Sequence, residues 1–292
     1  MPAIELAPGL RRLTAPNPSP MTLHGTNSFL IGQTDLAVID PGPESDAHLE
    51  AILAEVGPDQ RISHILVTHS HRDHSPLARA LSRATGAPVL AAGRSDWGRS
   101  PSMRALADAG LIGGGEGVDE GFAPDRQLAD GEIISADGWR IEALHTPGHM
   151  ANHLCFAWGD TLFSGDLVMG WSTSLISPPD GDLTAFRRSL RRLMARSDRI
   201  YYPAHGDAVT DPQARLSELV THRAGREDQI LAALAEGPAT PHALTARIYT
   251  DVAPALRSVA ERNVLAHLID LVERNLAEPI DEMAATGQFH LK

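Results

Sequence analysis

Short apolar runs and amphipathic segments alternate over the first two thirds of the chain. Residues 29–31 and 36–39 are two apolar runs joined by a short polar turn, which predicts a β-hairpin. Residues 64–68 form a continuous apolar run, which is typical of a strand covered on both faces. Ser75 and Pro76 then stand in the order of an N-cap and a first helical residue, so we expect a helix to begin there.

The same alternation continues to about residue 210. Leu183, Phe186, Leu190 and Leu193 have helical spacing, which predicts an amphipathic helix. Strands and helices in this order predict a layered α/β architecture. We expect the further strands at residues 89–92, 133–134, 140–144, 154–158, 161–164 and 200–202.

Residues 94–127 interrupt this alternation. They contain several glycines and a single short helical pattern near residues 103–109. Connections of this length are often functional. A substrate-covering loop and a plain insertion are both compatible with the pattern.

From about residue 212 the pattern becomes helical. Residues 216–234 predict one long helix or two in succession, another helix is expected to begin at Thr240, and residues 256–272 predict a third. A hairpin is expected within residues 276–291. Three helices and a terminal hairpin describe a winged-helix module. The two expected domains are residues 1–212 and residues 213–292, and the latter are called the C-terminal module below.

Composition narrows the chemistry. Of the 292 residues, 42% are hydrophobic and 21% are charged, so a sizeable core can form. Cys155 is the single cysteine, which excludes an intrachain disulfide and a cysteine-cage metal site. The net charge of -12 disfavours broad attraction to phosphate backbones. No apolar run approaches the length of a membrane span or a secretory signal, so we expect a cytoplasmic protein with no membrane partner.

The strongest candidate site is a cluster of histidines and an aspartate directly after the apolar run at residues 64–68. His69 and His71 are two residues apart and can point the same way in an extended chain. Asp73 and His74 lie around the turn into the next helix and must point elsewhere. This spacing suits two adjacent metal ions, one at each pair.

Three later residues stand at or just beyond predicted strand ends. His149 follows residues 140–144, Asp166 follows residues 161–164, and His205 follows residues 200–202. Ligand sites of open α/β sheets gather beyond strand ends, so these residues can converge on the first cluster. The candidate metal ligands are therefore His69, His71, Asp73, His74, His149, Asp166 and His205.

This set of residues resembles the metallo-β-lactamase superfamily over about residues 20–210. The resemblance implies a four-layer αββα sandwich that binds two metal ions and hydrolyses esters, thioesters, amides or phosphodiesters. It implies that Asp166 bridges the two ions. It also implies that the first ion is held by His69, His71 and His149, and the second by Asp73, His74 and His205.

Two departures from members of that superfamily refine the expectation. True metallo-β-lactamases commonly have a cysteine ligand where this chain has Asp166, so antibiotic hydrolysis is disfavoured. Oxygen-reducing di-iron members typically have a glutamate in place of His71. Ligation by histidine and aspartate alone favours two zinc ions over manganese or iron.

The C-terminal module resembles a narrower group, the β-lactamase-like protein 2 group. Members join this hydrolase fold to a C-terminal winged helix, and the animal members act on single-stranded RNA. The resemblance is carried by His222 and Arg223 and by residues 229–234, 246–249 and 264–268.

Two such zinc ions can share a bridging hydroxide, which then serves as the nucleophile. Asp73 is both a ligand and the candidate catalytic proton shuttle. Asp40 ends a predicted strand, where it either accepts a proton from a ligand imidazole or is a plain turn residue. His145 and His153 are further candidates to support the ligands or contact substrate, with a structural role as the alternative for His153.

We expect a dinuclear-metal hydrolase that cleaves an ester, thioester or lactone bond of a small molecule. The alternative is a single-stranded RNA endonuclease, and a winged-helix DNA-binding regulator ranks last. Residues 221–292 carry 7 basic against 10 acidic residues, whereas nucleic-acid-binding domains normally show a basic stripe. We therefore expect no binding to duplex DNA. The apolar stripe of the third C-terminal helix needs a partner surface within the module, on the hydrolase domain or across a homodimer.

Overall fold

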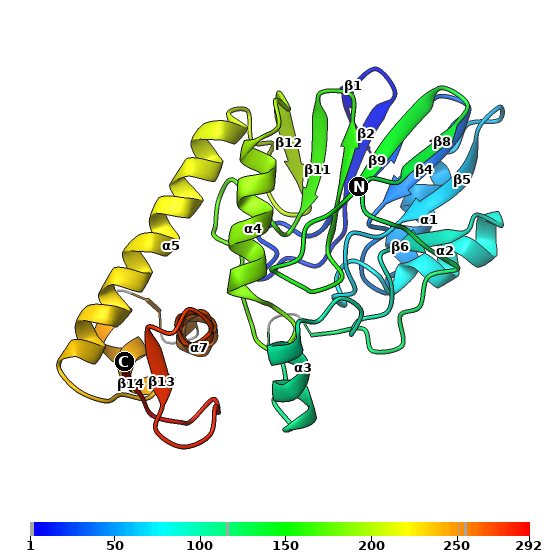
Figure 1. Ribbon diagram of the computed structural model, residues 1–292. Helices are drawn as coiled ribbons and strands as arrows, with labels where there is room; N and C mark the ends of the chain where they lie inside the picture. The colour runs from blue at the N-terminus through cyan, green and yellow to red at the C-terminus, as the bar shows by residue number, and fades with distance from the viewer. Residues whose placement is uncertain (1–2, 115–116, 251, 254–255) are drawn as a thin grey trace.

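Two β-sheets pack face to face in the N-terminal part of the molecule (Figure 1). The computed structural model describes residues 3–114, 117–250, 252–253 and 256–292. The first sheet has the strand order β1-β2-β3-β4-β5-β6-β7. Its strands are β1 (Ile4–Ala7), β2 (Leu10–Thr14), β3 (Asn27–Ile31), β4 (Asp35–Ile39), β5 (Arg61–Leu66), β6 (Val89–Ala91) and β7 (Arg126–Gln127).

The second sheet has the strand order β12-β11-β10-β9-β8, with β11 and β12 parallel and the other neighbours antiparallel. In the first sheet β4, β5 and β6 are parallel, so their carboxyl ends lie at the same edge. The strands of the second sheet are β8 (Ile133–Ala136), β9 (Trp139–His145), β10 (Leu154–Trp158), β11 (Thr161–Gly165) and β12 (Ile200–Pro203).

Helices cover the outer face of each sheet. Buried side chains between the sheets include Phe29, Phe156 and Phe163, and full burial of such a side chain stabilises the fold by roughly 1.5–3 kcal/mol. Outside the first sheet, α1 (Asp46–Ala54) and α2 (Leu77–Thr85) bury Ile52 and Leu81. Outside the second sheet, α4 (Leu183–Met194) buries an apolar stripe. The four layers form the αββα sandwich expected from the sequence.

The C-terminal module consists of three helices and a short antiparallel hairpin, as its apolar pattern predicts (Figure 1). The first helix is single and long rather than two in succession. It begins after Asp211, whose side chain caps it, and the second begins after Thr240, which caps it in the same way. The elements are α5 (Pro212–Ala235), α6 (Pro241–Ile248), α7 (Arg257–Glu273), β13 (Ala277–Pro279) and β14 (Phe289–Leu291).

The helix α5 belongs to two hydrophobic cores. Leu216 and Leu219 pack in the core outside the second sheet, together with Ala266 of α7. Ile230 and Leu234, two or more turns later, pack in the core of the C-terminal module. The apolar stripe of α7 is buried over residues 264–271 between these cores, so its partner surface lies within the chain.

A group of charged side chains around the buried Asp270 joins α4, α5 and α7. Asp270 of α7 accepts a hydrogen bond from Thr184 at 2.6 Å and forms an ion pair with Arg274 at 3.0 Å. Glu227 of α5 pairs with Arg274 at 2.7 Å and with Arg187 of α4. Because each charge has a partner from another part of the chain, these contacts fix how the three helices cross.

The structure differs from the sequence-based expectations at a few elements. The predicted hairpin and the six further strands are present, but β1, β2, β7 and α1 were not anticipated. Ser75 does not cap α2: the N-cap is Pro76, and the Ser75 hydroxyl donates instead to Asp119 at 2.9 Å. Within residues 94–127, α3 (Pro101–Asp108) is the short helix that the pattern predicts. No helix in the described part of the chain is long and apolar enough to cross a membrane.

Candidate metal centre

All seven candidate ligands are buried and lie beyond the ends of strands of the two sheets. They form two groups, in each of which the potential ligand atoms lie within 4.8 Å of one another. The structure therefore brings together every residue of the predicted set. The first group is His69, His71, His149 and Asp166, and the second is Asp73, His74 and His205.

Three imidazoles face one another in the first group. Nε2 of His69 and Nε2 of His149 each lie 3.0 Å from Nδ1 of His71. His149 donates its Nδ1 proton to the carbonyl of Leu175 at 2.8 Å, which leaves Nε2 as a lone pair. Three ring nitrogens at this separation cannot all be satisfied by protons, so the arrangement suits a cation between them.

The second group places two imidazoles around one carboxylate. Oδ2 of Asp73 lies 3.2 Å from Nε2 of His74 and 3.1 Å from Nε2 of His205. His205 directs its other nitrogen to the carbonyl of Gly25 at 3.3 Å, which again leaves Nε2 facing the site. Nitrogen and carboxylate oxygen donors in this combination are the ligands that zinc accepts.

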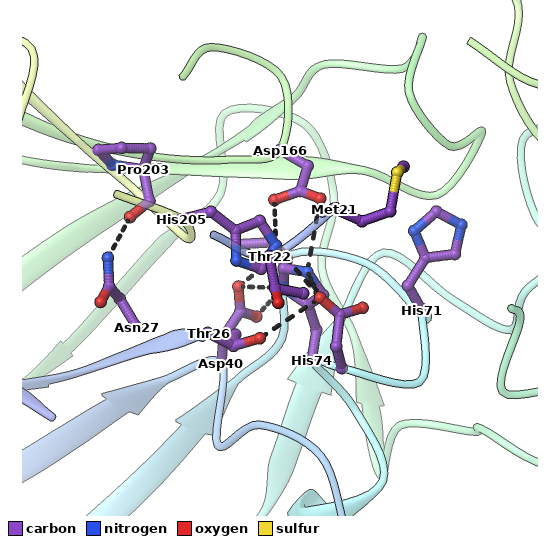
Figure 2. A network of polar contacts seen from close by, with 12 residues as sticks. Met21, Thr22, Thr26, Asn27, Asp40, His71, His74, Asp166, Pro203 and His205 are labelled. Atoms are coloured by element: carbon purple, nitrogen blue, oxygen red, sulfur yellow. Dashed lines mark hydrogen bonds and ion pairs between the residues drawn. The ribbon is translucent and has the colours of Figure 1, made fainter. Parts of the chain in front are cut away.

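Asp166 faces both groups (Figure 2). Its Oδ2 lies 3.5 Å from Nε2 of His149 and 3.6 Å from Nε2 of His74, and its Oδ1 lies 3.3 Å from Nε2 of His205. The main chain of Asp166 is also held, because Ser174 donates its hydroxyl proton to the carbonyl at 2.6 Å. This position between the groups is the one that a bridging ligand needs.

Buried polar atoms without partners test whether metal ions fit. Among the described residues, Oδ1 of Asp73, Nε2 of His74 and Oδ1 of Asp166 are buried and have no hydrogen-bond partner. Leaving each such atom unsatisfied costs about 1–3 kcal/mol. All three belong to the two ligand groups, where bound cations would satisfy Nε2 of His74 and Oδ1 of Asp166.

The charges of the site are arranged for cation binding. Burial and the neighbouring His149 lower the pKa of His71 to about 3, so this imidazole is neutral. Although burial opposes it, the Asp166 carboxylate raises the pKa of His205 to about 10, so without a metal ion this imidazole holds a proton that a bound cation would replace. Burial likewise opposes ionisation of Asp73, but His74 and His205 hold the pKa of Asp73 well below its usual range. The carboxylates are therefore ionised where metal ligands must be deprotonated.

Asp40 supports ligands of both groups. It is 2% exposed and accepts hydrogen bonds from the Thr68 amide and the Thr68 hydroxyl, each at 2.7 Å, and from Nδ1 of His74 at 3.0 Å. The Thr68 hydroxyl in turn lies 2.9 Å from Nδ1 of His69. Asp40 has a positive φ of 49°, a strained backbone for a non-glycine residue that a functional contact commonly explains. These contacts fit a supporting residue rather than a plain turn residue.

The other two candidate supporting residues lie in different surroundings. His153 is fully buried, accepts the amide proton of Asp166 at 3.3 Å and lies 3.0 Å from the Thr146 hydroxyl, so it contacts a ligand's main chain and does not line the cavity. His145 lies apart from the ligand groups. It donates to the carbonyl of Ala151 at 2.9 Å and packs against Trp97, and it contacts none of the candidate ligands in the described structure.

The two ligand groups open into a cavity of about 320 Å³. One side of the cavity is formed by five of the ligands, and another by Met169, residues 171–173 and Leu175. The C-terminal module forms the third side through α5, α7 and described residues between α6 and α7. Its lining residues are His222, Arg223, Arg226, Tyr249, Val252, Leu256, Val259, Ala260 and Asn263.

Residues 94–127 contribute no described residue to this cavity. They pack against the chain segment that carries the first ligands. Val118 forms a β-bridge with His71, and the amide of Asp119 donates to the carbonyl of Ser70 at 2.8 Å. The segment thus stabilises the chain that carries the first ligands.

A short segment, residues 174–176, lies between the ligands and the C-terminal module. Its Ser174 hydroxyl holds Asp166 and its Leu175 carbonyl holds His149, as described above. From the other side, Arg223 donates to the carbonyl of Ser174, and Asn263 accepts the amide proton of Ile176 at 3.1 Å.

The sequence analysis did not identify Thr68, Ser174, Asn263 or Tyr249 as site residues. Thr68 had a local signal, because it stands directly before His69 in the motif. The others are brought to the site by contacts between residues far apart in the chain, such as Ile176 with Asn263. Local periodicity carries no information on such contacts.

Comparison with known proteins agrees with this arrangement. A family model described as the metallo-β-lactamase superfamily matches residues 21–205, and one described as the β-lactamase associated winged helix domain matches residues 240–285. An atrochrysone carboxyl ACP thioesterase of Aspergillus chevalieri is 31% identical over 241 residues, covering 80% of this chain and 68% of that protein. A β-lactamase-like protein 2 homolog of Drosophila melanogaster is 29% identical over 250 residues, covering 80% and 79%.

A solved structure extends the similarity to the whole chain. The crystal structure of a metallo-β-lactamase family protein from Thermus thermophilus has 26% identity and a TM-score of 0.78. The match covers 99% of this chain and 100% of that one, so both parts of the molecule have counterparts there. The chain therefore belongs to the metallo-β-lactamase superfamily of hydrolases and carries the associated winged helix domain.

Proposed function

We propose that this chain is a thioesterase whose site takes two zinc ions. The observation that carries the proposal is the position of Asp166, whose two carboxylate oxygens face the two ligand groups at the base of a cavity. The thioester specificity is supported by similar proteins that are named as thioesterases. Zinc is supported by a donor set of histidine and aspartate alone.

Each part of the site has a distinct task in this proposal. His69, His71 and His149 hold one ion, and Asp73, His74 and His205 hold the other, with Asp166 between them. Two bound metal ions supply Lewis acidity for the scissile carbonyl and activate water at neutral pH. Asp73 moves a proton toward the leaving thiolate, because its Oδ1 is free of hydrogen bonds to the described residues. The cavity walls orient the acyl chain.

The metal part of the proposal is tested by elemental analysis of protein purified without added metal. We expect close to two zinc ions per chain, and close to two manganese or iron ions would correct the metal but leave the dinuclear site. One ion or none in a protein that still hydrolyses its substrate would overturn it.

The reaction is tested with a panel of thioesters, esters, lactones, phosphodiesters and short single-stranded RNA. We expect thioesters to have the highest kcat/KM. Preferred cleavage of an ester or lactone would keep the hydrolase and correct the bond. Cleavage of RNA in place of thioesters would replace this proposal by the endonuclease alternative.

Further proposals concern the whole molecule. We propose a division into residues 1–212 and 213–292, supported by the start of α5 at Pro212. The DNA-binding alternative is disfavoured because residues 264–271 of α7 are buried, whereas a recognition helix must be exposed to enter a groove. A cytoplasmic location remains our prediction, and a homodimer is not needed to cover α7.

A further inference from the structure

Two arginines and a histidine of α5 line the cavity without a carboxylate partner in the described part of the chain. They are His222, Arg223 and Arg226. Their neighbour Arg215 differs, because it pairs with Glu218 at 3.0 Å. Arg223 and Arg226 therefore place positive charge at the cavity that no described carboxylate neutralises.

Arg223 is the one of the three whose side chain is buried. It is 3% exposed, and its guanidinium donates to the carbonyl of Ser174 and to Oδ1 of Asn263, the latter at 3.0 Å. Its Nε has no hydrogen-bond partner among the described residues. Burial lowers the pKa of Arg223 to about 10, which reflects the cost of holding this charge away from water. An anion in the cavity would offset that cost.

Arg226 is oriented for an incoming anion. Its guanidinium lies 4.2 Å from the ring centroid of Tyr249, a cation–π contact that fixes the plane of the group. One nitrogen donates to Gln229 at 2.9 Å and, more weakly, to the carbonyl of Ile248 at 3.4 Å. Nε and the other terminal nitrogen donate to no described residue. A planar fork with free donors matches a carboxylate or phosphate.

The remaining walls of the cavity between these cations and the ligand groups are largely apolar. Val252, Leu256 and Val259 come from the C-terminal module, and Met169 and Trp171 come from the hydrolase part. This lining suits a carbon chain, and about 320 Å³ is enough for a small ligand.

We propose that His222, Arg223 and Arg226 form a subsite for an anionic group, carboxylate or phosphate, on the thioester substrate. The inference rests on the proposed thioesterase function, because the scissile carbonyl is taken to lie at the metal ligands. The anion belongs either to the acyl chain, as a carboxylate, or to the thiol, as a phosphate. In both cases the carbon chain between the scissile carbonyl and the anion lies along the apolar walls.

The test compares matched substrates of the metal-loaded full chain. On the acyl side, the N-acetylcysteamine thioesters of glutarate and valerate differ by one carboxylate. On the thiol side, valeryl phosphopantetheine and valeryl pantetheine differ by one phosphate. We expect the charged member of at least one pair to be preferred about tenfold or more in kcat/KM, the size of one hydrogen bond to a charged group. The pair that shows the preference identifies the side that carries the anion.

Variants assign the preference to the subsite. Arg226→Gln should reduce the charged-to-neutral ratio about tenfold, mainly through KM, and Arg226→Lys should restore part of it. Arg247→Gln is the matched control, since Arg247 of α6 pairs with Glu236 at 3.4 Å and does not line the cavity. Equal kcat/KM for charged and neutral members of both pairs, or a ratio that Arg226→Gln leaves unchanged, would overturn the subsite.

A binding measurement separates this inference from the proposed function. The ketone analogues of the charged and neutral thioesters, with CH₂ in place of sulfur, are titrated calorimetrically. Binding that depends on the charge and on Arg226, without turnover of any thioester, would refute the thioesterase and support the anion subsite. A single-stranded oligonucleotide that binds more tightly than the analogues, with the same Arg226 dependence, would overturn the assignment to a small thioester.

Discussion

Asp40→Asn is the perturbation that tests most of the site at once. The Asp40 carboxylate accepts three hydrogen bonds, and through them it determines which nitrogen carries the proton in one histidine of each ligand group. His74 donates its Nδ1 proton to Asp40 directly. His69 donates its Nδ1 proton to the Thr68 hydroxyl, which can accept because its own proton goes to Asp40. Both histidines therefore present Nε2 as a lone pair.

An asparagine amide reverses this pattern. Its oxygen can still accept from the Thr68 amide, but its NH₂ group then faces the Thr68 hydroxyl and Nδ1 of His74. Thr68 would have to accept from the amide and donate to Nδ1 of His69. Both histidines would then carry a proton on Nε2, the atom that faces the metal groups.

The magnitude follows from the contacts of the two histidines. Loss of such a supporting contact lowers metal affinity about 10–100-fold for each ion, or about 1.4–2.7 kcal/mol. Because Asp40 serves one histidine in each group, we expect both affinities to fall. Thr68→Val removes the link to His69 alone, so it should weaken only the ion held by His69, His71 and His149.

The assay is competition for zinc with a chromogenic chelator, which resolves two dissociation constants. Asp35→Asn is the matched control. Asp35 begins the strand that Asp40 follows, and it pairs with the exposed Arg61 at 2.6 Å at the far end of that strand, so both affinities should stay at the wild-type values. If folded Asp40→Asn protein binds both ions within twofold of wild type, the role assigned to Asp40 is wrong.

Further predictions concern the bridging ligand, the metals and the C-terminal module. Asp166→Asn keeps the shape but removes the shared charge, so it should lower turnover at least about tenfold and lose one of two metals in elemental analysis. Metal removal by chelation should abolish hydrolysis and lower Tm by differential scanning fluorimetry, and zinc should restore both. Asn263→Ala removes an acceptor for Ile176 and Arg223, so it should reduce stability by about 1–3 kcal/mol in urea and weaken zinc binding. The intact protein should leave the gel mobility of mixed-sequence duplex DNA unshifted at low salt. A salt-sensitive shift would contradict the inference that the acidic C-terminal module does not bind duplex DNA.

The sequence predicts those parts of the site that follow strand ends. His69, His71, Asp73 and His74 are close in the chain, and an apolar run precedes them, so their spacing already indicates two groups of ligands. His149, Asp166 and His205 follow recognisable strands whose ends lie at one edge of the sandwich. The relation between strand and ligand is local, and local patterns are what a sequence displays.

The parts that the sequence did not predict depend on tertiary packing. β1 carries only exposed and half-buried side chains, and β2 buries Leu10 and Leu13 without a strict alternation, so both lacked the apolar signal of the inner strands. His145 stands beside a ligand-bearing segment in the chain, but its ring turns to Ala151 and Trp97. Arg223 and Tyr249 reach the cavity because α5 and α7 dock on the second sheet, which depends on contacts between distant residues.

The continuity of α5 has a consequence for how molecules are selected. Leu219 anchors the helix in the core outside the second sheet, and Ile230 anchors it in the core of the C-terminal module, with Arg226 between them. A helix of 24 residues is about 36 Å long and resists bending, because a bend breaks or stretches its hydrogen bonds. Arg226 is therefore held at a set separation from the metal ligands. A substrate can place its anion at Arg226 and its scissile carbonyl at the metal ligands only if the chain between them has the matching length. The rigid helix therefore selects substrates by length.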